Sequence, residues 1–577
     1  MDLVQLEFDT ELTLGKSIEN IGYTPLHDTY KKFGRFPMID PDWNETAFDT
    51  IDLMVALRLY NNKHLINSYV SADYKNSSNN ILQLRQQDFG LPSREYYLKD
   101  QYATELEAYR QYIVDIATFF NSSKVDAETD AADLIKFETY LANVSQSKAE
   151  TRDPAANYMK YTVSELYTNI SSEFEWLRYL NGFFQVVNYT FTNDTELVVH
   201  STEYLIKMTE KVLSTPKRVL ANYIIWRFTM NRVSNLPKSI QEIEAKFDKI
   251  VYGVQSKPAR WKKCVDYTNG FMGMAVGRLF VAKHFPEEAK SMALDMISGI
   301  RKAFTGLLNT VPWLNDKTRE VAKEKEEAIV EKIGYPEWIM NNTRLNEEYK
   351  GLLGNIADDK YFANTVASLR YLCNYELKYI LEPVKREFGA SPPTVNAYYS
   401  GTFNQIVFPA GILQPPFWGR DRPISLNYGA IGMVIGHEIS HGFDDRGRLF
   451  DKDGNLVKWW DDEVMNGVNT QSENIADNGG IKQSYQAFLH YQKKHGQGEV
   501  LPGLEEYTPN HLFFIAFAQQ WCVNYRPQAL KVAVEEGVHS PSMYRVRGPL
   551  ANFEEFSKVY KCKSGSSMNP VKKCAVW

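Results

Sequence analysis

The residues best suited to chemistry form a His-Glu-x-x-His motif that runs from His437 to His441. The motif lies in an apolar stretch without proline, residues 429–445, and this pattern predicts a buried helix. Residues four apart lie on one face of a helix, so the two histidines can present ring nitrogens to one tetrahedral zinc ion. Glu438 could then reach a water molecule at the metal without binding the metal itself. The motif predicts metal-assisted hydrolysis, and the alternative is a pair of histidines in an ordinary helical core.

A catalytic zinc ion takes three protein ligands and keeps one open position, so a third ligand is needed. The run Ser-Glu-Asn-Ile-Ala-Asp-Asn-Gly-Gly, residues 472–480, offers one if its serine caps a helix. Glu473 would then lie in the first turn, with Asp477 on the same face. Glu473 could bind the metal, while Asp477 and Asp444 could each accept the second N–H of a zinc histidine. Such a pair of acidic residues more often marks a solvated helix face, but the two glycines would let this helix pack closely against the first.

The composition limits the class of protein and its partners. The chain has 577 residues, of which 44% are hydrophobic, enough for two or more domains with sizeable cores. Its net charge of −6 provides no basic excess to neutralise phosphates, so we expect no nucleic-acid partner. No apolar stretch approaches the roughly 18 residues that span a bilayer, and the first residues lack the basic and apolar parts of a signal peptide. We therefore expect a soluble globular chain without an export signal or membrane anchor of its own.

The elements around these motifs are mainly helical. Apolar positions three and four apart across residues 101–120 predict an amphipathic helix, and the charged run 316–332 predicts a solvated one. The pattern changes near residue 390, and residues 395–399 and 405–409 have the composition of short strands. Pro409 inside the second run indicates an edge strand, which an extended peptide could join as a further strand. An edge strand that meets only solvent fits these residues equally well.

Several longer runs carry a family resemblance. They are residues 395–399, 408–417, 436–444 and 473–480, the pair Trp521-Cys522, and the C-terminal Cys-Ala-Val-Trp of residues 574–577. With these runs the chain resembles the neprilysin and endothelin-converting-enzyme family of zinc metalloendopeptidases, and weaker similarity begins near residue 20. The resemblance implies a mainly α (α+β) fold with a thermolysin-like zinc catalytic domain, residues 386–577. A large helical cap domain with interlaced linker segments, residues 20–385, would enclose a central chamber above it.

The resemblance also implies an activity and a role for each site residue. The protein would be a zinc endopeptidase, with one Zn2+ per chain, that hydrolyses oligopeptides on the amino side of hydrophobic residues. His437, His441 and Glu473 would bind the zinc ion, and Glu438 would take a proton from the attacking water and pass it to the leaving amine. His539 would stabilise the oxyanion, although the sequence around it alone indicates a surface-loop histidine. Asp477 would be a catalytic residue that, with Asp444, orients the zinc histidines. The substrate backbone would be held by Asn396, Ala397 and Arg545. The side chain after the scissile bond would enter an apolar pocket formed by Ile412, Phe417, Met433, Val434 and Trp521.

The sequence departs from the family pattern in two places. The family begins with a cytosolic tail, a membrane-spanning helix and a cysteine-rich segment that this chain does not show, so membrane association would require a segment absent from it. The segment between the two zinc motifs, residues 456–470, is shorter than the corresponding segment of the family and lacks a cysteine expected there. By resemblance, Cys522 and Cys562 would pair with N-terminal cysteines, Cys574 with the missing one, and Cys264 with one near Lys99, so none of these partners is present.

These departures leave alternatives open. By resemblance the protein is expected at the cell surface or outside the cell, as a glycoprotein with disulfide bonds, and Asn-x-Ser/Thr acceptors in the first 200 residues favour this. The first alternative function is a catalytically impaired homologue that binds peptides or proteins without turnover. The second is a zinc aminopeptidase, which the lack of a Gly-x-Met-Glu-Asn run for a free amino terminus disfavours. The oligomeric state and the physiological peptide do not follow from the sequence.

Overall fold

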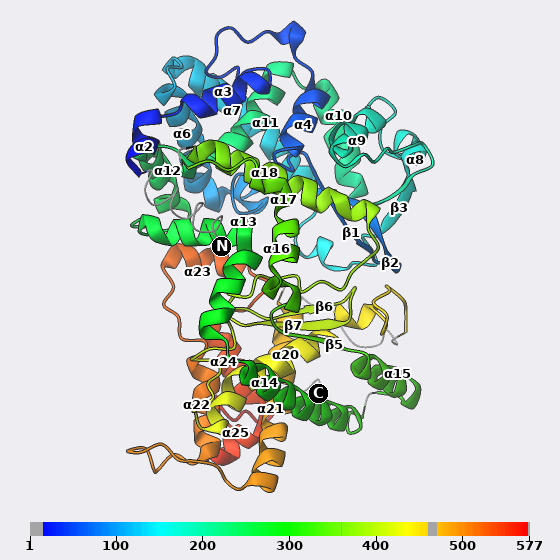
Figure 1. Ribbon diagram of the computed structural model, residues 1–577, viewed down its shortest axis with the longest axis vertical. Helices are drawn as coiled ribbons and strands as arrows, with labels where there is room; N and C mark the ends of the chain where they lie inside the picture. Colours follow the sequence, from blue (N-terminus) through cyan, green and yellow to red (C-terminus); the bar gives the residue numbers. More distant parts are fainter. Residues whose placement is uncertain (1–14, 313, 359, 460–469, 575–577) are drawn as a thin grey trace.

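The computed structural model describes residues 15–312, 314–358, 360–459 and 470–574. It has two lobes, each with its own hydrophobic core and a small sheet (Figure 1). The first core lies between residues 26 and 251 and also includes Phe362, Cys373 and Leu377. The second core takes its residues from 281–339 and 397–553. The chain therefore crosses between the lobes more than once.

The helices of the first lobe bury their apolar faces against one another. α6 (Ala103–Phe119) buries Tyr109 and Ile113 in the first core, which confirms the helix predicted for residues 101–120. The other helices of this lobe are α2 (Gly15–Ile21), α3 (Thr24–Lys32), α4 (Thr50–Arg58), α5 (Glu95–Leu98), α7 (Lys124–Val144), α8 (Val163–Asn169), α9 (Trp176–Phe184), α10 (Thr202–Ser214), α11 (Lys217–Met230) and α12 (Lys238–Val251).

The sheet of the first lobe reaches the second lobe through a hairpin. Its strands lie in the order β1 (Ile66–Asp73), β2 (Asn76–Gln86), β4 (Glu196–Val199) and β3 (Met159–Thr162). β1 and β2 are antiparallel, and β4 pairs in parallel with β2 and antiparallel with β3. The backbone N–H of Ser77, near the hairpin turn, donates to Asn455 Oδ1 of the second lobe at 2.9 Å. The hairpin therefore forms part of the junction between the lobes.

The lobes are joined by α13 (Arg260–His284) and by the segment that contains α16 (Asn342–Glu348), α17 (Lys350–Leu353) and α18 (Tyr361–Lys378) (Figure 1). α13 is interrupted at Met272, whose φ of −123° and ψ of 33° are not helical. Met272 packs with Leu345 and Leu352 in a small core of its own. This packing links the two connecting segments to each other.

The second lobe surrounds the predicted zinc helices. Residues 287–334 precede the predicted domain boundary at 385/386, yet they pack in this lobe's core; the boundary itself stays a prediction. The helices here are α14 (Glu287–Leu308), α15 (Asp316–Glu327), α19 (Ile424–Asn427), α20 (Met433–His441), α21 (Gln471–His495), α22 (Pro509–Gln519), α24 (Ser542–Asn552) and α25 (Glu554–Val559). Between α22 and α24 in the sequence, α23 (Pro527–Glu536) packs instead against the first lobe, where Val532 contacts the first core and Lys531 pairs with Glu105 at 2.9 Å.

The sheet of the second lobe corrects the predicted edge strand. β7 (Gln405–Pro409) lies in the middle, parallel to β5 (Val330–Gly334) and antiparallel to β6 (Tyr398–Ser400). The prediction that Pro409 marks an edge strand is wrong, because this proline is the last residue of β7, where its missing N–H removes little of the ladder. The edge next to the zinc helices is instead β6, the strand of the first run.

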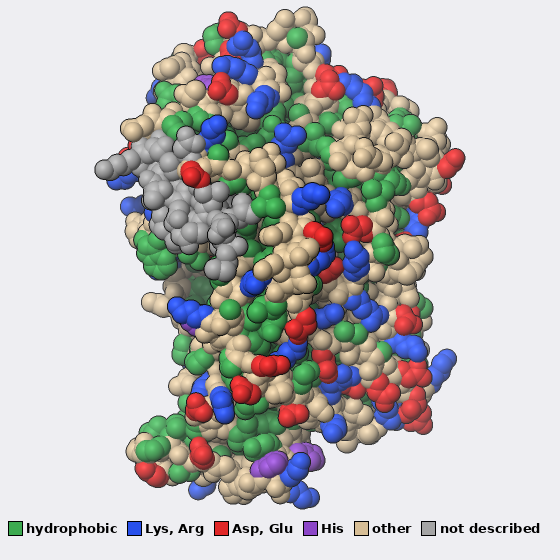
Figure 2. Space-filling model, viewed as in Figure 1, with side chains coloured by type: hydrophobic (Ala, Val, Ile, Leu, Met, Phe, Trp, Pro, Cys, Tyr) green, Lys and Arg blue, Asp and Glu red, His purple; other side chains and the backbone are tan. Residues whose placement is uncertain are grey.

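The outer surface carries mixed charges. Basic and acidic side chains are interspersed over the face of both lobes that Figure 2 shows, as a net charge of −6 from 65 basic and 71 acidic residues allows. Within the described residues, no helix is both long enough and apolar enough to cross a membrane.

Candidate active site

The two zinc-motif helices, α20 and α21, pack with their backbones nearly in contact. A Cβ atom on Gly480 of α21 would lie 2.7 Å from the backbone N of His437, and one on Gly436 would lie 2.8 Å from the carbonyl O of Gly480. Only glycine at both positions lets the backbones approach this closely. The close approach brings Glu473, in the first turn of α21, to the two histidines of α20.

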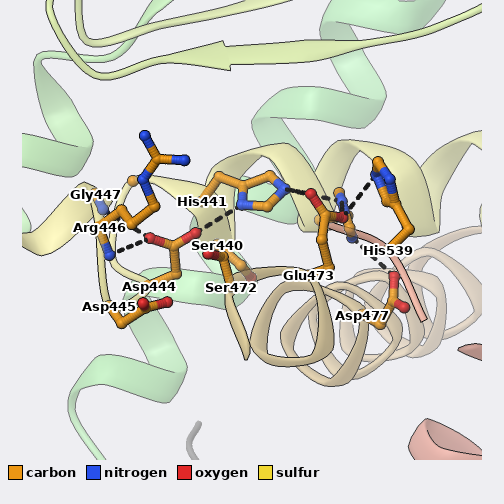
Figure 3. A network of polar contacts seen from close by, with 12 residues as sticks. Ser440, His441, Asp444, Asp445, Arg446, Gly447, Ser472, Glu473, Asp477 and His539 are labelled. Atoms are coloured by element: carbon orange, nitrogen blue, oxygen red, sulfur yellow. Dashed lines mark hydrogen bonds and ion pairs between the residues drawn. The ribbon is translucent and has the colours of Figure 1, made fainter. Parts of the chain in front are cut away.

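The three predicted metal ligands, His437, His441 and Glu473, converge on one point. Figure 3 shows His441 and Glu473 turned toward each other. Nε2 of His437 and Nε2 of His441 lie 3.0 Å apart. Glu473 Oε2 lies 3.3 Å from the first of these nitrogens, and Oε1 lies 3.5 Å from the second. Donor atoms around a tetrahedral zinc ion are separated by roughly 3.3 to 3.6 Å, given metal–ligand distances of about 2.0 to 2.2 Å. The two nitrogen–oxygen separations fall in this range and the nitrogen–nitrogen separation is about 0.3 Å shorter, so a small movement of the rings would fit the group to a zinc ion.

The second ring nitrogens of both histidines face carboxylates. His437 Nδ1 lies 2.9 Å from Asp477 Oδ1, and His441 Nδ1 lies 2.7 Å from Asp444 Oδ2. A carboxylate at Nδ1 keeps the proton on that nitrogen and leaves the lone pair on Nε2. Two lone pairs that face each other at 3.0 Å repel unless a cation lies between them. The donor set thus matches a divalent metal in chemistry as well as in spacing.

Behind His437, Asp477 belongs to a buried ion pair. Arg545 of α24 donates from Nε to Asp477 Oδ2 at 2.8 Å and from Nη2 to Asp477 Oδ1 at 2.7 Å. Nη2 also lies 3.4 Å from Glu473 Oε2, and the guanidinium stacks 4.0 Å from the ring centre of Trp521. Asp477 and Arg545 are both buried. The predicted substrate-binding arginine is therefore also the partner of the carboxylate that orients His437.

Behind His441, Asp444 belongs to a turn. Its Oδ1 accepts the backbone N–H groups of Arg446 at 2.8 Å and Gly447 at 2.6 Å, while its Oδ2 faces the histidine (Figure 3). A Cβ atom on Gly447 would lie 1.8 Å from the carbonyl O of His441, so this close approach requires glycine. One carboxylate thus fixes both the histidine and the turn that follows the helix.

Lys325 of α15 supports the same turn from the core. The residue is fully buried, and its Nζ donates to the carbonyl oxygens of Gly442 at 2.7 Å, Gly447 at 2.7 Å and Phe450 at 2.6 Å. These three acceptors match the three N–H groups of an ammonium. Burial lowers the pKa of Lys325 to about 7. The charged run 316–332 does contain a helix, but the prediction that it is solvated is wrong here, because the loop carbonyls require a buried donor.

An ion pair ties this turn to the first lobe. Arg152 donates from Nε and Nη2 to the carboxylate of Asp445 at 2.7 to 2.9 Å, and both side chains are 13% exposed. Nη2 also donates to Ser472 Oγ at 2.5 Å. The sequence predicted this serine as a helix cap, but α21 begins at Gln471, so Ser472 lies inside the first turn.

The charges of the cluster reinforce one another. Burial lowers the pKa of His437, but the carboxylates of Asp477 and Glu473 outweigh burial and raise that pKa to about 10. Burial raises the pKa of Glu473, but His437 and His539 outweigh it and hold the pKa below its usual range. The pKa of Glu438 is raised, mainly by burial. Glu473 therefore stays anionic, the carboxylates favour a positive charge at the histidines, and Glu438 has more proton affinity than an exposed glutamate.

One pocket of about 520 Å³ collects the predicted site. Asp477 lies behind its wall, fully buried. The side chain of His539 is 53% exposed, yet its Nε2 lies 3.1 Å from Glu473 Oε2. Interpreting this residue only as a surface-loop histidine therefore overlooks its contact with the metal-binding group. The pocket is lined by Asn396, Ala397, Ile412, Phe417, Met433, Val434, His437, Glu438, His441, Asp444, Glu473, Trp521, His539 and Arg545, together with Arg152 and Arg446, which the sequence analysis did not single out.

A larger hollow of about 1220 Å³ lies away from this chemistry. It opens between α3 and α16 to α18, and its described lining contains no histidine or cysteine. The catalytic site is therefore assigned to the smaller pocket, which holds the one group of metal-ligating side chains found among the described residues.

Comparison with known proteins places the chain in a family. The sequence profiles of "Peptidase family M13" match residues 13–336 with the N-terminal part and residues 396–469 and 461–576 with the catalytic part. The chain is 38% identical to human neprilysin over 97% of this chain and 80% of that protein. It belongs to peptidase family M13. This M13 peptidase is also 37% identical to rat endothelin-converting enzyme 1, over 97% of this chain and 76% of that enzyme.

Solved structures show the same fold. A zinc metalloprotease of Mycobacterium tuberculosis, Zmp1, in complex with an inhibitor superposes with a TM-score of 0.84 at 26% identity, over 96% of this chain and 86% of the other. PepO of Lactobacillus rhamnosis superposes with a TM-score of 0.81 at 22% identity, over 97% and 88%. These findings confirm the predicted family, the mainly helical chambered fold, the zinc cofactor and a zinc metalloendopeptidase. A homologue that only binds peptides is therefore not the function supported.

The disulfide and glycosylation predictions stay predictions. Cys373 is buried, whereas Cys522 and Cys574 are exposed. Most of residues 456–470, where the sequence departs from the family pattern, lies outside the described residues.

Proposed function

We propose that this M13 peptidase hydrolyses oligopeptides on the amino side of hydrophobic residues, at a zinc ion held by His437, His441 and Glu473. The observation that carries the specificity is the apolar side of the catalytic pocket. Ile412 and Met433 are buried in the second core, and Phe417, Val434 and Trp521 pack against it, directly beside the metal group. An apolar side chain of the substrate that packs against these residues is removed from water without the loss of any hydrogen bond of its own.

Glu438 supplies the proton transfers of this proposal. It is 5% exposed, lines the pocket and follows His437 directly, and burial raises its pKa. A zinc ion held by the three ligands would lower the pKa of a water molecule and polarise the scissile carbonyl. The Glu438 carboxylate would accept the proton of the attacking water and deliver it to the nitrogen of the leaving amine.

The substrate backbone would bind along β6. Asn396 and Ala397 directly precede this edge strand, and both line the catalytic pocket together with Tyr398 and Tyr399. An extended peptide can pair with the free side of an edge strand through main-chain hydrogen bonds, which hold any sequence in register. This arrangement favours extended oligopeptides over folded proteins.

His539 and Arg545 would stabilise the charge that develops on the scissile carbonyl oxygen. Both line the pocket, and both contact the Glu473 carboxylate, at 3.1 and 3.4 Å. Within the described residues, Arg545 donates its hydrogen bonds from Nε and Nη2, so the hydrogens of Nη1 would be left for the substrate. A donor of this kind contributes about 2 to 4 kcal/mol to lowering the barrier.

Quenched fluorescent peptides test the specificity. Two N-acetylated peptides that differ only in phenylalanine or glutamine after the intended bond would be compared, and the cut bond located by mass spectrometry. We expect kcat/KM to be at least about tenfold higher for phenylalanine. N-acetylation excludes aminopeptidase action. Equal rates, or cleavage on the carboxyl side of phenylalanine, would contradict the proposed specificity.

We also propose that the enzyme acts at the cell surface. Relatives named "Membrane metallo-endopeptidase-like 1" from mouse and human are 36% and 35% identical to this chain over 97% of its length. Acceptor sites such as Asn76 and Asn121 support glycosylation. Release of activity from intact cells by mild protease, and a mass decrease after glycosidase treatment, are expected; activity confined to the cytosolic fraction would contradict this location.

A further inference from the structure

A second cavity, of about 470 Å³, meets the catalytic pocket at Arg446. Arg446 lines both spaces. The rest of the second cavity is formed by the first lobe, with Arg85 of β2 and Tyr74 of the β1–β2 hairpin among its lining residues. A peptide in the catalytic pocket can therefore extend from Arg446 toward the facing wall of the first lobe.

The turn after α20 holds Arg446 in a fixed place relative to the metal group. Its backbone N–H donates to the same Asp444 carboxylate that faces His441 (Figure 3). The neighbouring Gly447 packs against the carbonyl of His441, and Lys325 binds the carbonyl of Gly447. The Arg446 side chain is exposed, so the turn presents a positioned backbone with its guanidinium directed to open space.

The carboxylates nearest to Arg446 in the sequence are already engaged. Asp444 faces His441 and two backbone N–H groups, and Asp445 accepts hydrogen bonds from Nε and Nη2 of Arg152. In the described part of the chain, no carboxylate forms an ion pair with Arg446. An ionic partner for this guanidinium can therefore come from a ligand.

Arg85, on the opposite wall, is in a similar position. Its Nη2 donates to Tyr74 Oη at 2.9 Å, and the guanidinium lies 5.2 Å from the ring centre of Tyr69. Its Nε is buried and has no hydrogen-bond partner among the described residues.

The other charged groups of the cavity largely cancel. Lys148 pairs with Glu536 at 3.1 Å, and Arg94 lies 3.9 Å from Glu95. Asp88 is the one further acid in the described lining, and its side chain is exposed. Two guanidiniums thus face a cavity that holds a single unengaged carboxylate, which gives it a positive excess.

The direction of the cleft determines which part of a substrate meets this charge. Met433 and Val434 of the apolar wall lie at the start of α20, the metal ligands follow, and Arg446 comes after its end. The apolar wall and Arg446 therefore lie on opposite sides of the metal group. A peptide whose residue after the scissile bond fills the apolar wall extends its amino-terminal part toward Arg446.

We propose that Arg446 and Arg85 form a positively charged, anion-binding subsite, which binds an acidic side chain on the amino side of the scissile bond. The inference rests on the proposed function and adds a substrate class to it: peptides with glutamate or aspartate before the bond and a hydrophobic residue after it. Charge-assisted hydrogen bonds from a planar guanidinium to a carboxylate are the contacts expected.

A peptide series tests the proposal on the zinc-loaded full chain. Each N-acetylated peptide carries phenylalanine after the bond and one glutamate at the first, second, third or fourth position before it, and each has a glutamine counterpart. At one or more positions, kcat/KM for glutamate should exceed that for glutamine by about fivefold, the size of one partly exposed ion pair. Raising the salt to 1 M should reduce the preference, because the contact is solvent-accessible.

Charge variants identify the residues responsible. Arg446→Gln and Arg85→Gln should each lower the glutamate-to-glutamine ratio toward one, and Arg446→Glu should reverse it in favour of lysine at the same position. The matched control is Arg420→Gln, which removes the same charge from an exposed residue outside both cavities and should leave the ratio unchanged.

The outcomes separate this inference from the proposed function. The anion-binding subsite is overturned, while peptide cleavage remains, if the wild-type glutamate-to-glutamine ratio is one at every position. It is also overturned if Arg446→Glu does not change that ratio. Failure to cut any of the peptides overturns the proposed function itself. If Arg420→Gln lowers the glutamate-to-glutamine ratio as much as Arg446→Gln and Arg85→Gln do, the effect is due to net charge, and the subsite is overturned.

Discussion

The two histidines of the metal centre are supported in different ways. Behind His437 stands a charged pair of side chains, Asp477 and Arg545, both buried. Behind His441 stands Asp444, whose other partners are backbone N–H groups of a turn. A buried ion pair tolerates the loss of one charge badly, whereas a turn needs only an oxygen acceptor at the same place. The same orienting function is thus built from interactions with unequal sensitivity to mutation.

The largest expected effect separates the two supports by isosteric replacement. Asp477→Asn leaves the buried Arg545 without its full counter-charge and should lower the free energy of unfolding by about 3 to 5 kcal/mol. Asp444→Asn retains an oxygen for the two N–H groups and should cost about 1 kcal/mol. Urea unfolding of the zinc-free proteins measures both without a contribution from metal affinity, with Asp453→Asn in the exposed part of the same loop as control. Equal losses for the two variants would contradict the contrast.

The same two variants should resemble each other in metal binding. Each removes the carboxylate that orients one zinc histidine, and such changes weaken metal affinity by roughly 10- to 100-fold. Competition with a chelator of known affinity measures this for the purified proteins. Unchanged zinc affinity in either variant would show that the corresponding carboxylate does not orient the ligand.

Lys325 is the next point at which the turn can be broken. Lys325→Met leaves three buried carbonyls without their donor and should lower the free energy of unfolding by about 3 kcal/mol. Lys317→Met, an exposed lysine on the same helix, should change it by less than about 0.5 kcal/mol. A comparable loss in both variants would mean that charge or helix propensity, not the carbonyl contacts, sets the effect.

Lys325 also predicts a pH dependence. Burial lowers its pKa from 10.5 to about 7, so below about pH 7 both the folded and the unfolded chain hold the proton. Between about pH 7 and 10.5 the unfolded chain binds a proton that the folded protein has released, so the lysine's contribution to stability rises with pH in this window. The unfolding free energy of the wild type minus that of Lys325→Met should therefore be larger at pH 9.5 than at pH 7. A difference that shrinks with pH would contradict the lowered pKa.

The smallest effect concerns the ion pair that joins this turn to the first lobe. Arg152 and Asp445 form two parallel hydrogen bonds, but both side chains keep 13% of their exposure. A double-mutant cycle with Arg152→Gln and Asp445→Asn should give a coupling energy of about 1 kcal/mol. A coupling near zero would indicate that the lobes are held together by other contacts.

The sequence identified the metal group because its information is local. His437 and His441 are four residues apart on one helix, and Glu473 follows in a run with its own helical spacing and glycines. Gly480 also indicated the packing that brings these three residues together. A glycine in the middle of a helix, where no turn requires it, indicates that another backbone lies close by. Local spacing and backbone requirements therefore sufficed for the ligands.

The supporting contacts could not be predicted in the same way. Lys325 binds carbonyls more than 100 residues away, and Arg152 meets Asp445 from the other lobe. A charged run with helical spacing looks solvated until the fold places unsatisfied carbonyls beside one of its lysines. Likewise, Pro409 was read as an edge signal because the sequence does not show that β7 ends at this residue. These features depend on partners that only the tertiary structure supplies.

Zinc content and peptide turnover of Glu438→Gln, measured on the same sample, show whether Glu438 is the proton acceptor at the metal. We expect about one zinc ion per chain and a kcat lowered by roughly 10²- to 10⁴-fold on a peptide with phenylalanine after the bond, because the glutamine cannot accept the proton of the attacking water. Turnover within about tenfold of the wild type, with zinc bound, would contradict the role of Glu438 and with it the proposed mechanism.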